Sequence, residues 1–577
     1  MKYKTSKRKI AILGGGPSGL FMYKRFIESG DSDLEIHIFE RKGYLGAGMP
    51  YSEEGANDEH ITNVSDNEIP EIFNSISEWV KTAPEDLLHR FKIIPEKFNE
   101  YKVLPRLFFG VYLSAQFDLL CKRAKENGIL TEVHLNTDVT NLVDDRVKCK
   151  VHVETNLRKS ESFDHVIICT GHSWPKKFEG KIPGYYDSPY PPVKLKKKFN
   201  HTVAIKGASL TAIDAIRTIA RSNGKFTEDE HGKLSFSLNA DSPDFKITMH
   251  SRNGLLPAVR FHLEDSHLDK NGLLSKADMA CHIQENQGFI SLDFIFEKNF
   301  KEMFIEKDPE FYDQIKEMDL ETFVDTIMNK REKLNAFDLF KMEYKEAEKS
   351  IQRKESIYWK EMLAVLSFTM NYPAKYLSAE DMQRLQKVLM PLISIVIAFV
   401  PQSSCRDLMA LYDAGLLSLI AVGDESTTVP SDKGGVKYSY KDEQDHLADS
   451  YFETFIDCIG QPHLSFNDFP FQGLIDSGTV SPAKLRFRSQ QHGAIEIIKE
   501  KELVKKDKNG QYYMRVPGIT INDSFQITDE NGVANPRIYI MAVPYIGGYN
   551  PDYSGIDFSE AASAAVLNSI NSFKMKI

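Results

Sequence analysis

The residues most clearly able to do chemistry form a glycine-rich turn near the start of the chain. Gly14, Gly16 and Gly19 have the G-x-G-x-x-G spacing, after a short apolar run at residues 10–13. Gly14 permits a tight turn, Gly16 lets the backbone approach a pyrophosphate, and Gly19 lets a helix pack close to a strand. The helix that begins here would direct its free N–H groups and positive dipole end toward phosphates. The spacing therefore predicts a dinucleotide site.

An acidic residue completes this first unit. Residues 34–39 read as a second strand, which ends at Glu40. A carboxylate at that position accepts hydrogen bonds from ribose hydroxyls. Pro17 and Ser18 belong to the same turn and Arg41 follows the acid, so all three are further candidate contacts. The alternative is a glycine turn in a Rossmann-like unit that holds no nucleotide.

A second strand–turn–helix unit begins near residue 203. Its turn has the pattern Gly207-x-Ser209-x-Thr211, so small residues replace two of the three glycines. Small residues still allow close approach, and the two hydroxyls can bond a phosphate. The strand that follows ends in Ser251-Arg252, at the place that Glu40 has in the first unit. A cation there suits a 2′-phosphate and favours NADP(H) over NAD(H), although Arg252 as a solvent-facing charge is the alternative.

Other candidate ligand-binding residues lie in loops and at strand ends. The apolar strand 166–169 ends in Thr170-Gly171, where the backbone can approach a ligand. Asn63, in a loop-like segment, can hydrogen-bond a cofactor or form a turn. Arg106 precedes an amphipathic helix and can meet a phosphate or a carboxylate, or form a surface ion pair.

Length and composition set the class of protein. A chain of 577 residues exceeds one compact core, so two or three domains are expected. The net charge of −10, with no long basic block, argues against a nucleic-acid partner. The six cysteines are scattered, with no C-x-x-C pair. This indicates reduced thiols in the cytoplasm, no zinc or other metal site, and no redox-active cysteine pair of the disulfide-reductase kind.

No segment reads as a membrane anchor or a leader. The basic N-terminus runs into the first strand without an apolar region, so no signal peptide is expected. The apolar run 388–400 is too short to span a bilayer and contains Pro391. We predict a buried helix there, with a membrane-surface segment as the alternative. Residues 262–400 as a whole have helical periodicity and read as a helical insertion.

Four stretches together carry a family resemblance. GGGPSG with Glu40, CTGHSWP, GASLTAID with SRNG, and the closing IYIMAVP…GGYNPDYSGIDFSEAA resemble the two-dinucleotide-binding flavoproteins. Within them the chain is similar to FAD/NAD(P)-binding proteins related to flavin-containing and N-hydroxylating monooxygenases. The second motif departs from the family pattern at Ser209 and Ala212. The F-x-G-x-x-x-H-x-x-x-W signature is not found in this sequence.

This resemblance implies an α/β fold with two Rossmann-like, three-layer β/β/α domains in a glutathione-reductase-like arrangement. The implied divisions are 1–195 and 463–577 for FAD, 196–261 and 401–462 for NAD(P), and 262–400 for the insertion. It also implies that the helix beginning at Gly555, Ile556 and Asp557 points at the flavin N1–C2=O edge, where a positive dipole stabilises the reduced ring.

The implied activity is that of an NADPH-dependent flavin monooxygenase. FAD would accept a hydride and form a C4a-peroxyflavin that oxygenates a small-molecule N, S or C centre, and Asn63 would hydrogen-bond that adduct. NADH is the less favoured reductant. A flavin oxidase or reductase without oxygen transfer, and a flavin-binding redox sensor that docks a partner, are the alternatives. A homo-oligomer is compatible with the sequence.

Overall fold

The computed structural model describes residues 7–172, 174–263, 273–442, 445–461, 463–549 and 555–574. The first motif lies in a six-stranded sheet of order β23-β24-β9-β1-β2-β5, parallel except for β23 at its edge. These strands are β1 Arg8–Leu13, β2 Leu34–Phe39, β5 Leu130–His134, β9 His165–Ile168, β23 Gln526–Thr528 and β24 Ala534–Ile540. Because β9 pairs with both β1 and β24, the two ends of the chain share one sheet.

Two layers cover this sheet. On one side α1 (Pro17–Glu28) packs against α4 (Arg106–Glu126) and α18 (Gly555–Lys574). Strands β6 (Val139–Asp145), β7 (Lys150–Thr155) and β8 (Ser160–Phe163) form a second sheet that contacts β1, β9 and β24. Buried strand residues such as Ile10, Ile12 and Ile38 have no exposed surface. The predicted three-layer β/β/α arrangement of the first domain is thereby confirmed.

The second motif lies in a five-stranded parallel sheet of order β10-β19-β11-β14-β15. Its strands are β10 Tyr185–Tyr186, β11 Thr202–Lys206, β14 Lys246–Ser251, β15 Leu417–Ala421 and β19 Thr454–Asp457. Helices α5 (Leu210–Asn223) and α15 (Gln402–Asp413) pack together, and the sheet β16 (Thr427–Pro430), β17 (Val436–Lys441) and β18 (Leu447–Phe452) contacts β11. The hairpin β12 (Gly224–Glu228) and β13 (Leu234–Leu238) follows α5.

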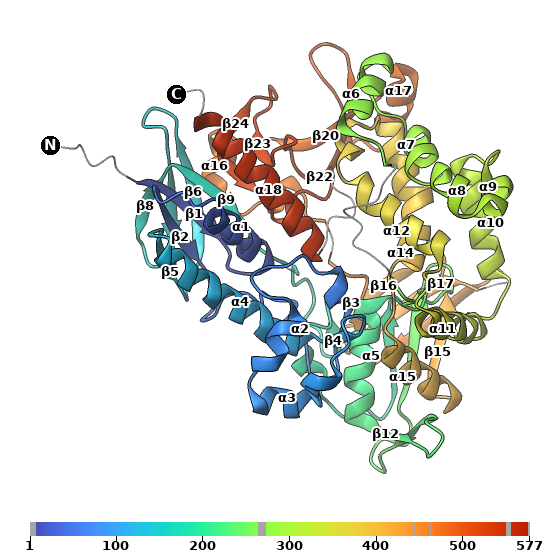
Figure 1. The fold of residues 1–577 in the computed structure, drawn as a ribbon. Helices are drawn as coiled ribbons and strands as arrows, with labels where there is room; N and C mark the ends of the chain where they lie inside the picture. The colour runs from blue at the N-terminus through green and yellow to red at the C-terminus, as the bar shows by residue number, and fades with distance from the viewer. Residues whose placement is uncertain are drawn as a thin grey trace.

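Helices fill the segment between β14 and α15, and Figure 1 shows them gathered at one side of the molecule. They are α6 Lys276–Glu285, α7 Leu292–Asn299, α8 Phe304–Lys307, α9 Pro309–Ile315, α10 Leu320–Glu332, α11 Ala336–Arg353, α12 Tyr358–Met370, α13 Ala379–Arg384 and α14 Met390–Val396. The predicted helical insertion is therefore present. Along α11, Phe337, Phe340 and Ala347 are buried in the core of the second domain, whereas Ile351 is exposed.

The remaining elements complete the first domain. Short helices α2 (Ile76–Trp79) and α3 (Glu85–Phe91) and the pair β3 (Ile61–Ser65) and β4 (Val103–Pro105) precede α4. Near the C-terminus, α16 (Gln472–Asp476) and α17 (Gln490–Lys499) accompany the sheet β20 (Pro482–Arg486), β22 (Tyr512–Ile519) and β21 (Val504–Lys506). Among the described residues, no helix is both long enough and apolar enough to cross a membrane.

Candidate functional site

The glycine turn after β1 leaves no room for side chains. Gly14 has φ +107°, and a Cβ there would lie 2.6 Å from the Cys169 carbonyl oxygen. A Cβ on Gly19 would lie 2.0 Å from the Gly14 carbonyl oxygen, because α1 packs directly on the turn. Gly16 is the N-cap residue of α1, and as a glycine it has no side chain to cap that helix. The first N–H groups of α1 thus remain available to an anionic ligand.

Glu40 follows β2 and reaches back to this turn. Its Oε2 accepts a hydrogen bond from the Gly15 amide at 2.7 Å, and its Oε1 accepts one from the Lys42 amide at 2.8 Å. The side chain is buried. Each carboxylate oxygen keeps a second lone pair, so ribose hydroxyls can still be accommodated. The backbone therefore fixes the orientation of the acid before any ligand binds.

These groups open into a cavity of about 380 Å³ at the carboxyl ends of β1, β2, β9 and β24. A volume in this range is typical of small-molecule sites. We call it the first pocket. Most of the residues predicted from the sequence line it: Gly14, Gly16, Pro17, Ser18, Glu40, Arg41, Asn63, Thr170, Gly171, Gly555, Ile556 and Asp557. Gly19 lies behind the wall, where its role is close packing of α1.

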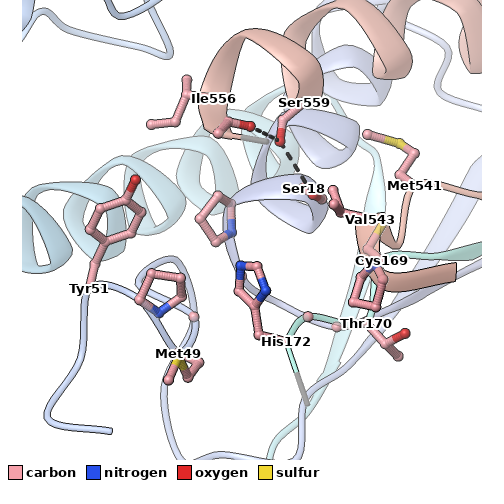
Figure 2. Close-up of a pocket in the computed structure, with 18 of the residues that line it drawn as sticks. Ser18, Met49, Tyr51, Cys169, Thr170, His172, Met541, Val543, Ile556 and Ser559 are labelled. Atoms are coloured by element: carbon pink, nitrogen blue, oxygen red, sulfur yellow. Dashed lines mark hydrogen bonds between the residues drawn. The ribbon is translucent and has the colours of Figure 1, made fainter. Parts of the chain in front are cut away.

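The first residues of α18, near the C-terminus, form one wall of the first pocket. Ser18 in α1 and Ser559 in α18 place their hydroxyl oxygens 3.3 Å apart, which joins the two helices at this wall (Figure 2). Asp557 lies in the first turn of α18. Burial, and to a smaller extent the carboxylates of Glu68 and Glu560, raise the pKa of Asp557 to about 7.

Two buried side-chain polar atoms of the first pocket have no hydrogen-bond partner among the described residues. They are Asp557 Oδ1 and Thr170 Oγ1. Buried polar atoms are rarely left unpaired in native proteins, because the loss of solvation is costly. Together with the free N–H groups of α1 and the acceptor Glu40, they fit a ligand that carries an anion, ribose hydroxyls and further polar atoms, as FAD does.

His172 is a pocket residue that the sequence did not single out. It follows Gly171 and lines the first pocket, where Figure 2 shows its ring between the Met49–Tyr51 loop and Cys169 and Val543, which follow β9 and β24. Its Nδ1 contacts Oε1 of Gln461, which follows β19 of the second domain. Burial lowers the pKa of His172, so the imidazole is neutral near pH 7. The GHSWP stretch contained this residue, but only the tertiary contact with Gln461 marks it.

Arg106 lies apart from the other predicted cofactor contacts. The sequence suggested it as a cofactor contact, yet it lies outside the first pocket. Its guanidinium Nη2 is 2.7 Å from Oδ2 of Asp214 in α5, and its Nε donates to the Ile61 carbonyl at 3.2 Å. Burial tends to lower its pKa, but Asp214 and Tyr190 outweigh burial and raise it. Arg106 therefore joins the two domains. The sequence indicated that Arg106 could meet a carboxylate, but it did not indicate that the carboxylate belongs to Asp214.

A second arginine, Arg260, was missed. It is buried, forms an ion pair with Glu68, and donates to the Asn63 carbonyl and to the Ser65 hydroxyl. Because Glu68 and Asn63 both line the first pocket, Arg260 fixes that wall from the side of the second domain. Its sequence neighbours gave no indication of this contact.

The second motif also opens into a cavity, of about 540 Å³, which we call the second pocket. It lies at the carboxyl ends of β11, β14, β15 and β19. Gly207 has φ +110°, and a Cβ there would lie 2.8 Å from the Cys458 carbonyl oxygen. Ser209 is the N-cap residue of α5, and its side chain does not cap that helix. The predicted residues that line this pocket are Gly207, Ser209, Ser251 and Arg252.

Thr211 is not among the lining residues, and its hydroxyl lies near Gly460 instead. The Arg252 guanidinium is half exposed and lies 3.5 Å from Asp424. Ser251 Oγ and His250 Nε2 are buried without partners among the described residues. Burial lowers the pKa of His250 to about 4, so this ring is neutral. The second pocket thus resembles the first in having unsatisfied polar atoms, but Arg252 is already paired with a carboxylate.

Cysteine chemistry has little support at either pocket. All six cysteines are free. Cys169 lines the first pocket and Cys458 the second, and burial raises the pKa of both thiols. A disulfide reductase needs two thiols close to the flavin, one of them reactive. Among the residues described, the first pocket offers a single buried thiol.

Comparison with known families locates two parts of the chain. Residues 11–173 match the family described as FAD-NAD(P)-binding. The predicted resemblance to FAD/NAD(P)-binding proteins is confirmed. Residues 275–397 match the family described as the YdhS-like middle domain, which covers the helices α6 to α14.

Two curated proteins and a solved structure are similar to the chain. The uncharacterized protein YdhS of Escherichia coli is 28% identical over 81% of this chain and 86% of its own length. The thiol-specific monooxygenase of Saccharomyces cerevisiae is 26% identical, over 31% of this chain and 37% of its own length. DfoA, a cadaverine monooxygenase from Erwinia amylovora bound to FAD, superposes with a TM-score of 0.44 at 11% identity, covering 98% of this chain and 95% of DfoA.

A superposition at that level carries no functional argument. The predictions of a flavin-dependent oxidoreductase, and of FAD and a nicotinamide nucleotide as its cofactors, agree with the match over residues 11–173.

Proposed function

We propose that this protein is an FAD-dependent monooxygenase that takes electrons from NADPH and oxygenates an N, S or C centre of a small molecule. The observation that carries the proposal is a side-chain contact between the two strand exits that line the two pockets. The strand exit of β9 lines the first pocket, the exit of β19 lines the second, and His172 contacts Gln461 where these exits meet. Bound FAD would supply hydride acceptance and oxygen activation.

The chain's own residues would hold FAD along the first pocket. Backbone N–H groups at the start of α1 would bind the pyrophosphate, and the preoriented Glu40 carboxylate would accept from the ribose. The unpartnered Thr170 hydroxyl and Asp557 carboxyl would bond the ring end. At neutral pH Asp557 is partly protonated, since its pKa is raised to about 7. It can therefore donate or accept a proton beside the N-terminus of α18.

Water exclusion and orientation fall to the apolar part of the pocket. Met49, Met541, Val543 and Ile556 line it, and Figure 2 shows them around His172. A dry pocket strengthens hydrogen bonds to a reacting group and limits side reactions. Asn63, in β3, would donate a hydrogen bond to the oxygen that is transferred to the substrate.

In the second pocket, Gly207 and the start of α5 would bind the pyrophosphate of NADPH. Arg252 would meet the 2′-phosphate, for which a guanidinium gives charge-assisted, bidentate hydrogen bonds. Asp424 would have to swing away, and at 80% side-chain exposure it has room to do so.

The second candidate is a flavin oxidase or reductase without oxygen transfer. The observation that favours it is the same Asp424, which partly neutralises Arg252 and weakens the case for NADPH. A cysteine-based reductase is disfavoured, because the first pocket has a single buried thiol within its described lining.

The test uses the purified full-length protein. We expect a yellow protein whose flavin is bleached anaerobically by NADPH faster than by NADH. On admission of air with a thiol or amine substrate, oxygenated product should form and the peroxide released should fall below one per NADPH. Peroxide equal to NADPH with every substrate would support the oxidase or reductase reading. A protein that binds no FAD on reconstitution would contradict both.

A further inference from the structure

A cluster of histidines and glutamates lies at the edge of the first sheet, on strands that carry the nucleotide site. His37 in β2, with Glu132 and His134 in β5, place their ligand atoms within 4.8 Å of one another. In Figure 1, β2, β5 and β8 lie side by side near the N-terminal end of the molecule. We propose that His37 Nδ1, His134 Nε2 and Glu132 form a site for a divalent transition-metal ion of the zinc class.

The distances suit one small ion. His37 Nδ1 lies 3.0 Å from His134 Nε2 and 3.8 Å from a Glu132 oxygen, and His134 Nε2 lies 3.8 Å from the other Glu132 oxygen. In a tetrahedral site with bonds of about 2.0–2.1 Å, neighbouring ligand atoms are roughly 3.3 Å apart. The observed separations lie on both sides of this value. Glu161 in β8 has an oxygen 3.7 Å from His37 Nδ1, so it is in reach as a fourth ligand.

A carboxylate behind His37 fixes its orientation. Oε1 of Glu35 accepts from His37 Nε2 at 2.9 Å, and Lys9 lies 2.8 Å from the same oxygen. A carboxylate can only accept, so the proton of a neutral His37 is on Nε2 and the lone pair of Nδ1 faces the cluster. Metal-binding histidines commonly donate their second N–H to such a carboxylate.

The charges around the cluster favour a cation. Glu35, Glu132 and Glu161 face it, with Lys9 and Lys159 as the cations nearby. A metal ion binds the neutral form of an imidazole through its free ring nitrogen. In the metal-free form His134 Nε2–H donates to His37, so metal binding moves the His134 proton to Nδ1.

The site is reachable from solvent and is linked to the first pocket. His37 is buried, but 60% of the Glu132 side chain and 19% of the His134 side chain are exposed. The ring of His134 stacks on Phe39 at 4.5 Å, and its carbonyl accepts from the Glu40 amide at 2.9 Å. A bound ion would therefore hold together β2 and β5 where they position the ribose-binding acid.

The experiment measures metal binding by the full-length protein, with Zn²⁺ in competition with a chromogenic chelator and with Co²⁺ by its visible d–d bands. We expect one equivalent bound with micromolar or tighter Kd, and Zn²⁺ should raise the melting temperature by linkage. His134→Gln and Glu132→Gln should each weaken binding by at least about tenfold. These two ligands are more exposed than His37 and are chosen because loss of buried His37 could impair folding. Far-UV circular dichroism checks each variant.

His152→Gln is the matched control. His152, in β7, also lies beside a carboxylate, with Nε2 3.4 Å from Asp145, but it is not in the cluster. Binding should be unchanged in this variant. Binding that is absent in the unmodified protein, or equally strong in His134→Gln, would overturn the site, as would a thiolate-to-Co²⁺ charge-transfer band that assigns the metal to a cysteine.

Discussion

The two nucleotide pockets are built on the same plan, but the first is far more constrained than the second. Both lie at the carboxyl ends of parallel strands, and both begin with a glycine of positive φ, Gly14 and Gly207. In the first, Gly19 brings α1 within van der Waals contact of the turn, and two hydrogen bonds from backbone amides fix Glu40. In the second, Ser209 replaces a glycine and Arg252 is half exposed beside Asp424.

The difference teaches that the first pocket is preorganised for its ligand, whereas the second keeps adjustable polar groups. A fixed cradle suits a cofactor that stays bound, because little order must be gained on binding. A looser cradle suits a cosubstrate that must leave after each turnover.

The largest effect on cofactor binding is expected from substitution of the two turn glycines, Gly14 in the first pocket and Gly207 in the second. Gly14→Ala should abolish FAD retention, because its Cβ would lie 2.6 Å from the Cys169 carbonyl oxygen and its φ is +107°. The backbone conformation alone costs about 1–3 kcal/mol. Gly207→Ala should leave FAD bound but abolish flavin reduction by NADPH. Flavin content and anaerobic reduction measure the two effects.

The control for this pair is Gly30→Ala. Gly30 has φ +65°, but a Cβ there would have no atom within 4 Å. This substitution should lower stability modestly and retain FAD. Equal loss of flavin in Gly14→Ala and Gly207→Ala would remove the distinction between the pockets.

Loss of the Arg106–Asp214 ion pair, which joins the two domains, should give the next largest effect, a loss of stability. Arg106→Met leaves the buried Asp214 carboxylate without its 2.7 Å partner. Breaking a buried pair in this way costs about 3–5 kcal/mol, so the chemical denaturation midpoint should fall. The dissociation constant of FAD should change less than about threefold. Addition of Asp214→Asn to this variant should restore part of the lost stability. A large loss of FAD affinity in Arg106→Met would instead show that Arg106 contacts the cofactor.

The buried carboxyl of the first pocket should make stability depend on pH. Because the pKa of Asp557 is raised to about 7, the folded FAD-free protein holds a proton that the unfolded chain releases. The contribution of this proton to the free energy of unfolding is complete below the unfolded pKa of about 3.9. It is lost as pH rises through 7. Asp557→Asn should remove roughly 4 kcal/mol of this dependence, because a pKa difference of about three between the folded and unfolded states corresponds to that free energy. The free energy of unfolding against pH tests it, with the exposed Asp432→Asn as control; parallel curves would contradict it.

The smallest effect is expected at the mouth of the second pocket. Arg252→Ala should lower kcat/KM for NADPH by about 10–100-fold, which corresponds to a charge-assisted contact of about 1.5–3 kcal/mol. The value for NADH should change little, since NADH lacks the 2′-phosphate. Arg252→Lys should recover part of the preference. Flavin reduction rates with both nucleotides give the measurement, and an equal loss for both would show that Arg252 does not read the phosphate.

The sequence was sufficient for features that depend on local backbone chemistry. Gly14, Gly16 and Gly19 could be assigned to a strand–turn–helix. Glycine tolerates the positive φ of Gly14 and the close backbone approach at Gly16 and Gly19. Glu40 and the Thr170-Gly171 exit were found because the carboxyl ends of parallel strands share an edge of the sheet. The helices at residues 276–396 followed from apolar periodicity.

Only the tertiary structure decided the contacts between segments distant in the chain. Arg106 could meet a phosphate or a carboxylate, and the approach of the two domains gave it Asp214, which lies 108 residues away by the numbering. His172 and Arg260 gain their roles from Gln461 and Glu68. His37 and His134 come together only when β2 and β5 pair. Local preferences are encoded over a few residues, but ion pairs and ligand sets depend on how the sheets and helices assemble.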